Sequence, residues 1–470
     1  MKAPPDILAD LWHSLDLPPD ALDRVVLTGS EPVLPSSFRV DAIAQVTIAA
    51  VAAAAAMHWR ARGGKKQDVG VDGRAAAAEF RSERIASIDG AAPRELWDPI
   101  AGAYRCGDGR WVRLHTNFAH HHDGLLRLLG CDNDRKSVQA ALAGRNAERF
   151  ESAATQADMV VAMMRSFAEW DAHPHAPVIA ARQLVAVTRI GDAPAEALPE
   201  GARPLGGVRI LDLTRIIAGP VCGRALAAHG ADVLRVIGPG LPTVEALDID
   251  SGRGKLSATI ELGSDAGTAT LRNLVREADV FVQGYRPGAL AARGFSAQDV
   301  AALRPGVVYA SLSAYGADGP WGGKRGFDSL VQTATGFNHA EGQAAGSDEP
   351  KPLPCQALDH AAGYLLALGV LAALYRRAQL GGSWQVDVSL ARTAHWLRGL
   401  GRLEHGLSAP DPKPADMVAS FEVSQSGYGR LSSAPHAARL SLTPARWERP
   451  SMPFGTHPPA WPARSGSWTR

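Results

Sequence analysis

The sequence predicts an α/β protein built on a doubly wound parallel sheet, and two observations support this prediction. Short β-branched segments alternate with helical patterns through residues 207–313, which is the order of strand, helix and strand in a parallel sheet. Such units place helices on both faces of the sheet. The chain of 470 residues is also long enough for two or three domains, each with a sizeable buried core.

The composition is that of a globular protein with no strong electrostatic preference. Lys and Arg number 49 against 48 Asp and Glu, so the net charge of +1 gives no basis for binding nucleic acid or an anionic membrane. The four cysteines are far apart and show no CxxC spacing, which argues against disulfides and a structural zinc site. Residues 1–19 lack the basic and apolar stretches of a secretory signal. We therefore expect a cytoplasmic protein without a metal ion.

The two longest apolar runs belong to an internal repeat. Val46–Met57 and Ala361–Tyr375 are each shorter than the roughly 20 residues that cross a bilayer, so both are expected to be buried helices. In each copy an Asp opens the helix, and a Gly-Gly turn and a Gln follow it at a constant offset of 318 (359 − 41 = 385 − 67). Residues 1–90 are interpreted as a partial copy of the later region, with chance similarity as the alternative. The repeated residues are Asp41, Gly63, Gly64 and Gln67, and then Asp359, Gly381, Gly382 and Gln385.

The elements of the predicted sheet follow in order after residue 206. The first turn has a single Gly219 followed by Pro220 and lacks both GxGxxG and a Walker lysine, which disfavours a dinucleotide or P-loop phosphate site. Strands are expected at 207–213, 230–236, 278–284 and 306–313. Helices are expected from the turn at 218–220 to residue 226, at 266–277 and at 297–303.

Composition divides the rest of the chain into further regions. Residues 196–206 are rich in Pro and Gly and are predicted to be a linker. Residues 207–403 then form the sheet domain, and residues 404–470, rich in Pro, Ser and Gly, are predicted to be an extended tail. A small α+β domain is predicted over 91–195, with a strand at 111–116 and helices at 125–129, 138–142 and 159–170.

Eight segments match, in order, the motifs of one known family. They are LDLTRIIAGP (211–220), LAAHGADVLRV (226–236), GRGKLSATIEL (252–262), ADVFVQGYRPGALAARGF (278–295), RPGVVYASLSAYGADGPW (304–321), GFDSLVQTATGF (326–337), ALDHAAGYLLALGVLAAL (357–374) and GGSWQVDVSL (381–390). With them the chain resembles the family III CoA-transferases, the CaiB/BaiF group. The resemblance implies a Rossmann-like, CoA-binding large domain at 207–403 and an interlocked homodimer. It also implies an acyl-CoA and a carboxylic acid as substrates, and no cofactor or metal beyond CoA.

Asp359 falls where members of this family place their catalytic aspartate. In the mechanism that the resemblance implies, the carboxylate attacks the donor thioester, and an aspartyl-CoA thioester then forms that the acceptor acid resolves. The sequence pattern alone favours a structural role for Asp359, as an N-cap of the helix that starts near Ala361. The two roles are compatible, because helix-terminal N–H groups keep a carboxylate ionised.

The resemblance also places CoA contacts on two turns and two arginines. Arg235 and Arg293 are the expected phosphate partners, and a solvated surface arginine is the alternative for each. The chain departs from the family at Val236-Ile237 and at Gln283-Gly284-Tyr285, where members often have Val-Glu and Glu-Asn-Phe. The full set of expected CoA contacts is Ile216, Ile217, Ala218, Arg235, Gly284, Tyr285, Arg286 and Arg293.

Two other activities are alternatives to transfer. Racemases of the family use a Gly-His-Asp turn, whereas this chain has Gly326-Phe327-Asp328. An apolar ring cannot move a proton, so transfer is favoured over racemisation or epimerisation. The second alternative is a catalytically inactive CoA-binding homologue, because the order of the segments is unusual.

The order of the segments indicates a composite, either permuted or partly duplicated. The Asp41 helix corresponds to the family's catalytic helix, but no LDLT-AGP module precedes it, so Asp41 is interpreted as a relic or a structural cap. The N-terminal half is expected to lend its small domain to the C-terminal half. Within that domain, one histidine of His120-His121-His122 is a candidate contact for the acceptor acid, whereas a metal site is not expected because consecutive side chains diverge.

Overall fold

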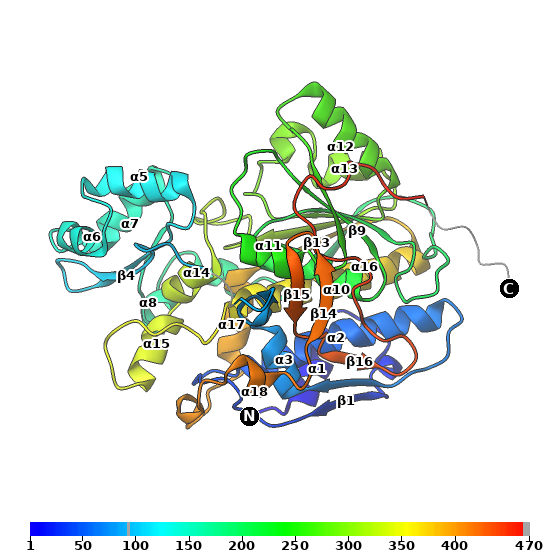
Figure 1. Ribbon diagram of the computed structural model, residues 1–470, viewed down its shortest axis with the longest axis horizontal. Coiled ribbons are helices and arrows are strands. Elements are labelled where there is room, and N and C mark those ends of the chain that lie inside the picture. The colour runs from blue at the N-terminus through cyan, green and yellow to red at the C-terminus, as the bar shows by residue number, and fades with distance from the viewer. Residues whose placement is uncertain (92–94, 464–470) are drawn as a thin grey trace.

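A seven-stranded sheet lies at the centre of the computed structural model, which describes residues 1–91 and 95–463 (Figure 1). Its strand order is β10-β9-β8-β11-β12-β13-β7, and every neighbouring pair is parallel except β13 and β7. The predicted α/β fold with a doubly wound parallel sheet is therefore confirmed. The strands are β7 (Ala186–Gly191), β8 (Arg209–Leu213), β9 (Asp232–Ile237), β10 (Lys255–Thr259), β11 (Val280–Gln283), β12 (Val308–Ser313) and β13 (Ser383–Ser389).

The order in which the chain adds strands to the sheet reverses between β8 and β11. The chain passes from β8 to β9 and β10 on one side, and it then returns to β11 on the other side of β8. The loops that follow β8 and β11 therefore diverge at the carboxyl ends of two neighbouring strands. In doubly wound proteins this reversal leaves a crevice in which ligands bind.

Helices cover both faces of the sheet, so its strands bury apolar side chains on both sides. In β8, Ile210 packs in the core formed with α10 and α16, whereas Leu211 and Leu213 pack against α12 and α13. Figure 1 shows α12 and α13 together at the top of the molecule. The α-helices between β8 and residue 399 are α10 (Ala218–Ala228), α11 (Glu245–Ser251), α12 (Asp265–Glu277), α13 (Ala297–Leu303), α14 (Asp328–Ala334), α15 (Phe337–Ala344), α16 (Ala357–Leu380) and α17 (Leu390–Gly399).

Two long apolar helices, α2 (Val40–Ala61) and α16, pack against each other in the main core. By length and composition both could cross a membrane, and both are almost wholly buried within the protein. A core helix passes the same test, so this property is weak evidence for a membrane span. The two predicted buried helices are therefore confirmed.

Segments from the two ends of the chain form two small sheets. Strand β16 lies beside β2 in the sheet β1-β2-β16, and β15 lies between β14 and β3. The predicted extended tail over 404–470 is therefore wrong in part, because its strands pair with the first 90 residues, which no local pattern reveals. Its last residues, 464–470, lie outside the described residues. The strands are β1 (Val25–Thr28), β2 (Val69–Asp72), β3 (Ser87–Ile88), β14 (Glu422–Ser426), β15 (Gly429–Ser433) and β16 (Ala438–Leu440).

A small α+β unit with its own core lies beside the sheet, on the left of Figure 1. The helix predicted over 159–170 is wrong, because the structure has a strand there and then a short helix that starts after Ser166, whose side chain forms a capping box with Glu169. A short apolar run does not distinguish a buried strand from a helix. The elements are β4 (Gly102–Arg105), β5 (Trp111–Leu114), β6 (Val161–Met163), α5 (Ala119–Leu129), α6 (Arg135–Leu142), α7 (Ala147–Gln156) and α8 (Phe167–Asp171).

The connections complete the fold. Between β7 and β8, residues 192–208 form no helix or strand, and this stretch contains the predicted linker at 196–206. Residues 92–94, at the start of the predicted small domain, lie outside the described residues. The remaining helices are α1 (Pro4–His13), α3 (Gly73–Glu79), α4 (Ser82–Ile85), α9 (Ala176–Ala180) and α18 (Pro414–Met417).

Candidate active site

A cavity of about 340 Å³ opens at the crevice between β8 and β11. The loops after β8, β11 and β12 form three of its sides, and Asp359 reaches it from the first turn of α16. Phe118 and His121, from the start of α5, close it from the small α+β unit. The cavity therefore lies where the topology of the sheet predicts a ligand site, and the small unit supplies one wall.

The turn between β8 and α10 has an unusual backbone. Ile216 has φ of +77°, which is the left-handed region and is strained for a β-branched residue. Gly219 follows in the first turn of α10, and a Cβ at this position would lie 2.7 Å from the Thr214 hydroxyl oxygen, so a larger residue does not fit. The predicted contacts Ile216, Ile217 and Ala218 all line the cavity. Strain of this kind is typical of functional sites, because only the surrounding structure holds it in place.

Asp359 is a buried carboxyl group, only 7% exposed, at the wall of the cavity. Within the described residues its side chain makes no hydrogen bond. Burial is the largest cause that raises its pKa well above the ordinary range, and the charges of Asp328 and Glu83 add to it. The prediction that helix-terminal N–H groups keep this carboxylate ionised is therefore wrong.

Asp328, at the start of α14, takes the capping role that the sequence suggested for Asp359. Its Oδ2 accepts hydrogen bonds from the backbone N–H groups of Leu358 and Asp359, at 2.8 and 3.0 Å. Gln332 donates to its other oxygen. Asp359 is the third residue of α16 rather than its N-cap. A residue 31 positions earlier in the sequence caps the helix, and local spacing does not reveal such a partner.

The second turn, after β11, also reaches the cavity through Gly284, Tyr285 and Arg286, as the sequence predicted. The remaining two predicted contacts do not line it. The guanidinium of Arg235 donates to Ser257 and to the carbonyl oxygens of Asp248 and Met452. Phe454 covers it, with Cζ 4.1 Å from the ring centroid. The C-terminal segment thus binds the Arg235 guanidinium, which is not available to a ligand in the cavity. Its partner Met452 is 217 residues away, and the sequence gives no sign of such a distant contact.

Arg293 is the other predicted phosphate partner that stays outside the cavity. It donates to the carbonyl oxygen of Leu262 at 2.9 Å on the exposed surface. Three other cations line the cavity instead, and the sequence did not predict them: Arg215, Lys324 and Arg325. Arg215 lies within the LDLTRIIAGP motif itself, so its position at the turn was the one available signal.

The position that holds histidine in racemases is occupied by a packed aromatic ring. Phe327 stacks on His115 with centroids 3.8 Å apart and planes at 6°. In the histidine stretch, His121 is buried at the cavity, whereas His122 contacts Asp123 and Asn133, each at 2.9 Å, and His120 is exposed. The three consecutive rings thus lie in different environments, and of the three only His121 lines the cavity.

Asp41, the counterpart of Asp359 in the repeat, has a different environment. Its Oδ2 accepts from the backbone N–H groups of Val33 and Leu34 at 2.6 and 3.2 Å, and it does not line the cavity. Burial raises its pKa to about 6. Asp41 therefore anchors the loop that enters α2.

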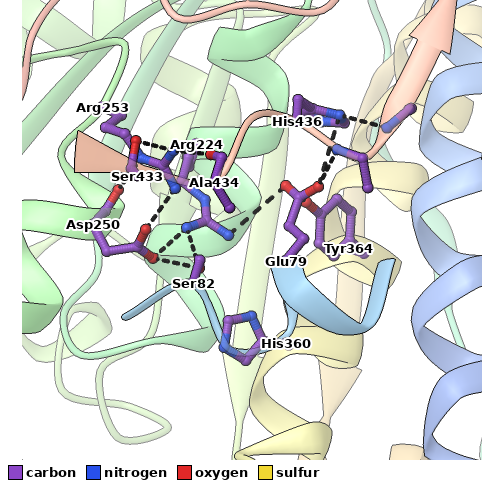
Figure 2. Close-up of polar contacts among 12 residues, drawn as sticks. Glu79, Ser82, Arg224, Asp250, Arg253, His360, Tyr364, Ser433, Ala434 and His436 are labelled. Atoms are coloured by element: carbon purple, nitrogen blue, oxygen red, sulfur yellow. Dashed lines mark hydrogen bonds and ion pairs between the residues drawn. The ribbon is translucent and has the colours of Figure 1, made fainter. Parts of the chain in front are cut away.

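A buried polar network lies against α16, beyond Asp359 (Figure 2). Arg224 of α10 contacts Asp250, and Arg253 reaches the same carboxylate at 2.5 Å. Ser82, from the first 90 residues, donates to Asp250 at 2.8 Å. Glu79 accepts the hydroxyl hydrogen bond of Tyr364, which is on α16. The network also includes Ser433, Ala434 and His436, so it ties α16 and α10 to both ends of the chain.

Comparison with known families shows to which family the chain belongs. The model of the family "CoA-transferase family III" matches residues 25–199 and 205–428, which is most of the chain. The chain belongs to this family. The match includes both the small α+β unit and the sheet with its cavity.

Several curated transferases are similar to this family III chain over part of its length. It is 36% identical over 199 residues to an acetyl-coenzyme A transferase of Hypoxylon pulicicidum, which covers 42% of this chain and 34% of that protein. It is 32% identical over 269 residues to a probable fatty acyl-CoA transferase of Mycobacterium tuberculosis, with 53% and 68% covered. A crystal structure of the latter protein aligns with a TM-score of 0.40, 33% identity and 43% and 59% coverage.

A third relative is a succinate–glutarate CoA-transferase of Agrobacterium fabrum. The identity is 31% over 211 residues, which covers 41% of this chain and 52% of that protein. The chain thus spans between about a third and two thirds of the length of these curated relatives.

Proposed function

We propose that the protein transfers CoA from an acyl-CoA to a free carboxylic acid, with Asp359 as the nucleophile. The observation that carries this proposal is a carboxyl group that lies at the ligand crevice of a doubly wound sheet and has no hydrogen-bond partner among the described residues. Family membership and the transferases among the relatives support the same reaction. The proposed substrates are an acyl-CoA and a carboxylic acid, without a further cofactor.

The reaction is a series of acyl substitutions in which no redox change occurs. The Asp359 carboxylate attacks the thioester carbonyl, the C–S bond breaks, and CoA leaves as a thiolate, so that a mixed anhydride of Asp359 and the acyl group remains. The thiolate then attacks the aspartyl carbonyl and releases the donor acid, which leaves an aspartyl-CoA thioester. The acceptor carboxylate repeats the two steps in reverse order and departs as the new acyl-CoA.

The first turn of α10 is suited to stabilise the oxyanions of this series. Ala218 and Gly219 line the cavity, and first-turn N–H groups of a helix lack partners within the helix. Donors of this kind, placed where negative charge develops, are worth about 3–4 kcal/mol in comparable reactions. Because burial favours the protonated form of Asp359, loss of its proton precedes attack, and the rate is expected to rise with pH.

The substitution Asp359→Asn tests the proposal. It is expected to lower the transfer rate by at least about 10³-fold, because the amide cannot form the anhydride. Incubation with acetyl-CoA, acid quench and peptide mass spectrometry should detect CoA attached to the peptide that contains residue 359 in the wild type and not in the variant. Asp318→Asn, at an exposed carboxylate outside the cavity, is the matched control.

Other outcomes of this experiment identify the alternatives. Transfer by the Asp359→Asn variant at the original rate would falsify the proposal. Deuterium exchange at the α-carbon of an acyl-CoA, without transfer, would indicate a racemase or epimerase. Binding of CoA with neither reaction would indicate an inactive homologue. The homodimer that the family resemblance implies is part of the proposal and is tested by sedimentation of the purified chain.

A further inference from the structure

His121 is a polar group in the cavity wall that the proposed transfer does not use. It is only 2% exposed and lines the cavity, and neither ring nitrogen has a hydrogen-bond partner among the described residues. Burial is the largest cause that lowers its pKa, to about 3, so the ring is neutral with one donor and one acceptor. A buried polar group without a partner is unfavourable, and a bound ligand that supplies the missing hydrogen bond would relieve this cost.

Arg215 is a cavity cation that forms no ion pair with the acidic residues that the structure describes. It is partly buried, and its one hydrogen bond in the described part of the chain goes to the carbonyl oxygen of Pro242 at 2.9 Å. The neighbouring cations of the cavity wall, by contrast, are in ion pairs. Lys324 pairs with Glu151 at 2.9 Å, and Arg325 pairs with Asp158 at 2.6 Å.

The two groups lie around one aromatic ring. The guanidinium carbon of Arg215 is 6.0 Å from the ring centroid of Phe118, and the His121 ring centroid is 5.7 Å from the same ring. After burial, the interactions with His120, Arg325 and Arg215 lower the pKa of His121, and the charge of Asp158 opposes them. An anion at this place would pair with Arg215 and accept the N–H of His121.

We infer that Arg215 and His121 form an anion subsite in the cavity, distinct from Asp359, that binds a second anionic group of a substrate. The inference rests on the proposed transfer. The shared chemistry is an anionic oxygen, and it has two sources, a distal carboxylate of a dicarboxylic acceptor or a phosphate of CoA. In either case the subsite would favour a substrate that carries this anionic group over one of similar shape that lacks it.

Substrate pairs with and without the anionic group separate these sources. Glutarate and valerate are compared as acceptors with acetyl-CoA, and acetyl-CoA and acetyl-pantetheine are compared as donors. The variants are His121→Leu, His121→Gln and Arg215→Gln, and His405→Leu, at an exposed histidine outside the cavity, is the control. The quantity measured is the ratio of kcat/KM within each pair, with KM and kcat reported separately.

Loss of an ion-assisted hydrogen bond is expected to reduce one of these ratios by about 10-fold or more, mainly through KM. A fall in the glutarate ratio assigns the subsite to the acceptor, and a fall in the acetyl-CoA ratio assigns it to CoA. If neither ratio changes in any of the three variants, the inference is overturned. Because His121→Gln and Arg215→Gln keep polar side chains of similar size, poor folding of His121→Leu alone does not decide the result.

A measurement that needs no turnover distinguishes this inference from the proposed function. The imidazole resonances of His121, assigned by their absence in His121→Leu, are followed by NMR during a pH titration. Addition of glutarate or CoA is expected to raise the pKa of His121, because the bound anion favours the charged ring. If the pKa of His121 rises but no transfer is observed, the anion subsite is supported and the proposed reaction is rejected. Transfer without such a rise for either compound rejects the subsite.

Discussion

Asp328 and Asp359 are two carboxyl groups at the start of one helix with opposite surroundings. Asp328 accepts two backbone N–H groups and the Gln332 amide, whereas Asp359 has no partner among the described residues. Burial raises the pKa of Asp328 to about 6, and its charge in turn raises the pKa of Asp359. One residue thus both fixes the nucleophile's backbone and makes its ionisation harder.

This coupling predicts the pH dependence of the Asp328→Asn variant. Removal of the Asp328 charge removes a cause that raises the pKa of Asp359, so Asp359 ionises at lower pH. The acid limb of the pH profile of kcat/KM should move to lower pH. Well below the pKa, the ionised fraction of Asp359 should rise about tenfold for every pH unit by which the limb moves. An unchanged limb, or one moved to higher pH, would contradict the assignment. Asp318→Asn, at an exposed carboxylate, is the control.

At the scale of elements, close contact between α10 and α16 joins the strained turn to the nucleophile. Gly363 of α16 lies one turn after Asp359, and a Cβ there would lie 2.7 Å from the Val221 Cβ and would also meet the Ala218 carbonyl oxygen. Without a side chain at 363, α16 packs directly on the first turn of α10. The distance between Asp359 and Ala218 therefore depends on this glycine.

Gly363→Ala is expected to force the two helices apart. The strain should lower the free energy of unfolding by about 1–3 kcal/mol, and it should also lower kcat. Gly399→Ala, at a helical position with nothing within 4 Å, is the control, since alanine there should be neutral or stabilising. Chemical denaturation with parallel kinetics checks both. Stabilisation by Gly363→Ala would show that helix propensity dominates and that the contact is loose.

The buried network of Figure 2 makes the second prediction for the elements. Arg224→Met leaves Asp250 and Glu79 without their central cation, and all three side chains are nearly inaccessible. Loss of one partner of a buried pair is expected to destabilise the fold by about 3–5 kcal/mol. Arg398→Met removes the partly exposed partner of Asp171, and should change the free energy of unfolding by less than about 1 kcal/mol. If both variants change the free energy of unfolding equally, the buried network contributes little to the stability of the fold.

Much of the sheet was predictable from the sequence, and the reasons are local. Parallel strands buried on both faces are continuous apolar runs, such as those at 278–284 and 306–313, and these lie where β11 and β12 are found. The turn at 216–218 and Asp359 also reach the cavity as expected. The failures depend on distant partners. Arg235 is occupied by the tail, and Asp328 caps α16, and neither contact has a signal in the local pattern.

On the scale of the whole molecule, the first 195 residues and the rest of the chain share one core and one cavity. Helix α2 packs along α16, β16 adds to β2, and the small unit supplies Phe118 and His121 to the cavity. The arrangement is consistent with the predicted composite in which the N-terminal half lends its small domain. That division of the chain remains a prediction.

Deletion of residues 1–195 tests whether the two parts form one folding unit. The remainder should lack a fixed tertiary structure, because a long apolar face of α16 becomes exposed and Asp250 loses Ser82. Near-ultraviolet circular dichroism and limited proteolysis measure this, with the full-length chain as the control. A folded remainder that still transfers CoA would refute the composite.

The pairing of α2 with α16 also bears on synthesis of the chain. Helix α2 ends at residue 61 and α16 begins at residue 357, so 295 residues separate them (357 − 61 − 1). At roughly 5–20 residues per second, a ribosome needs roughly 15–60 s to deliver the second helix. During that interval the nascent α2 is an apolar segment without its partner. The yield of native protein is therefore expected to depend on a holdase chaperone that protects α2 until α16 is synthesised.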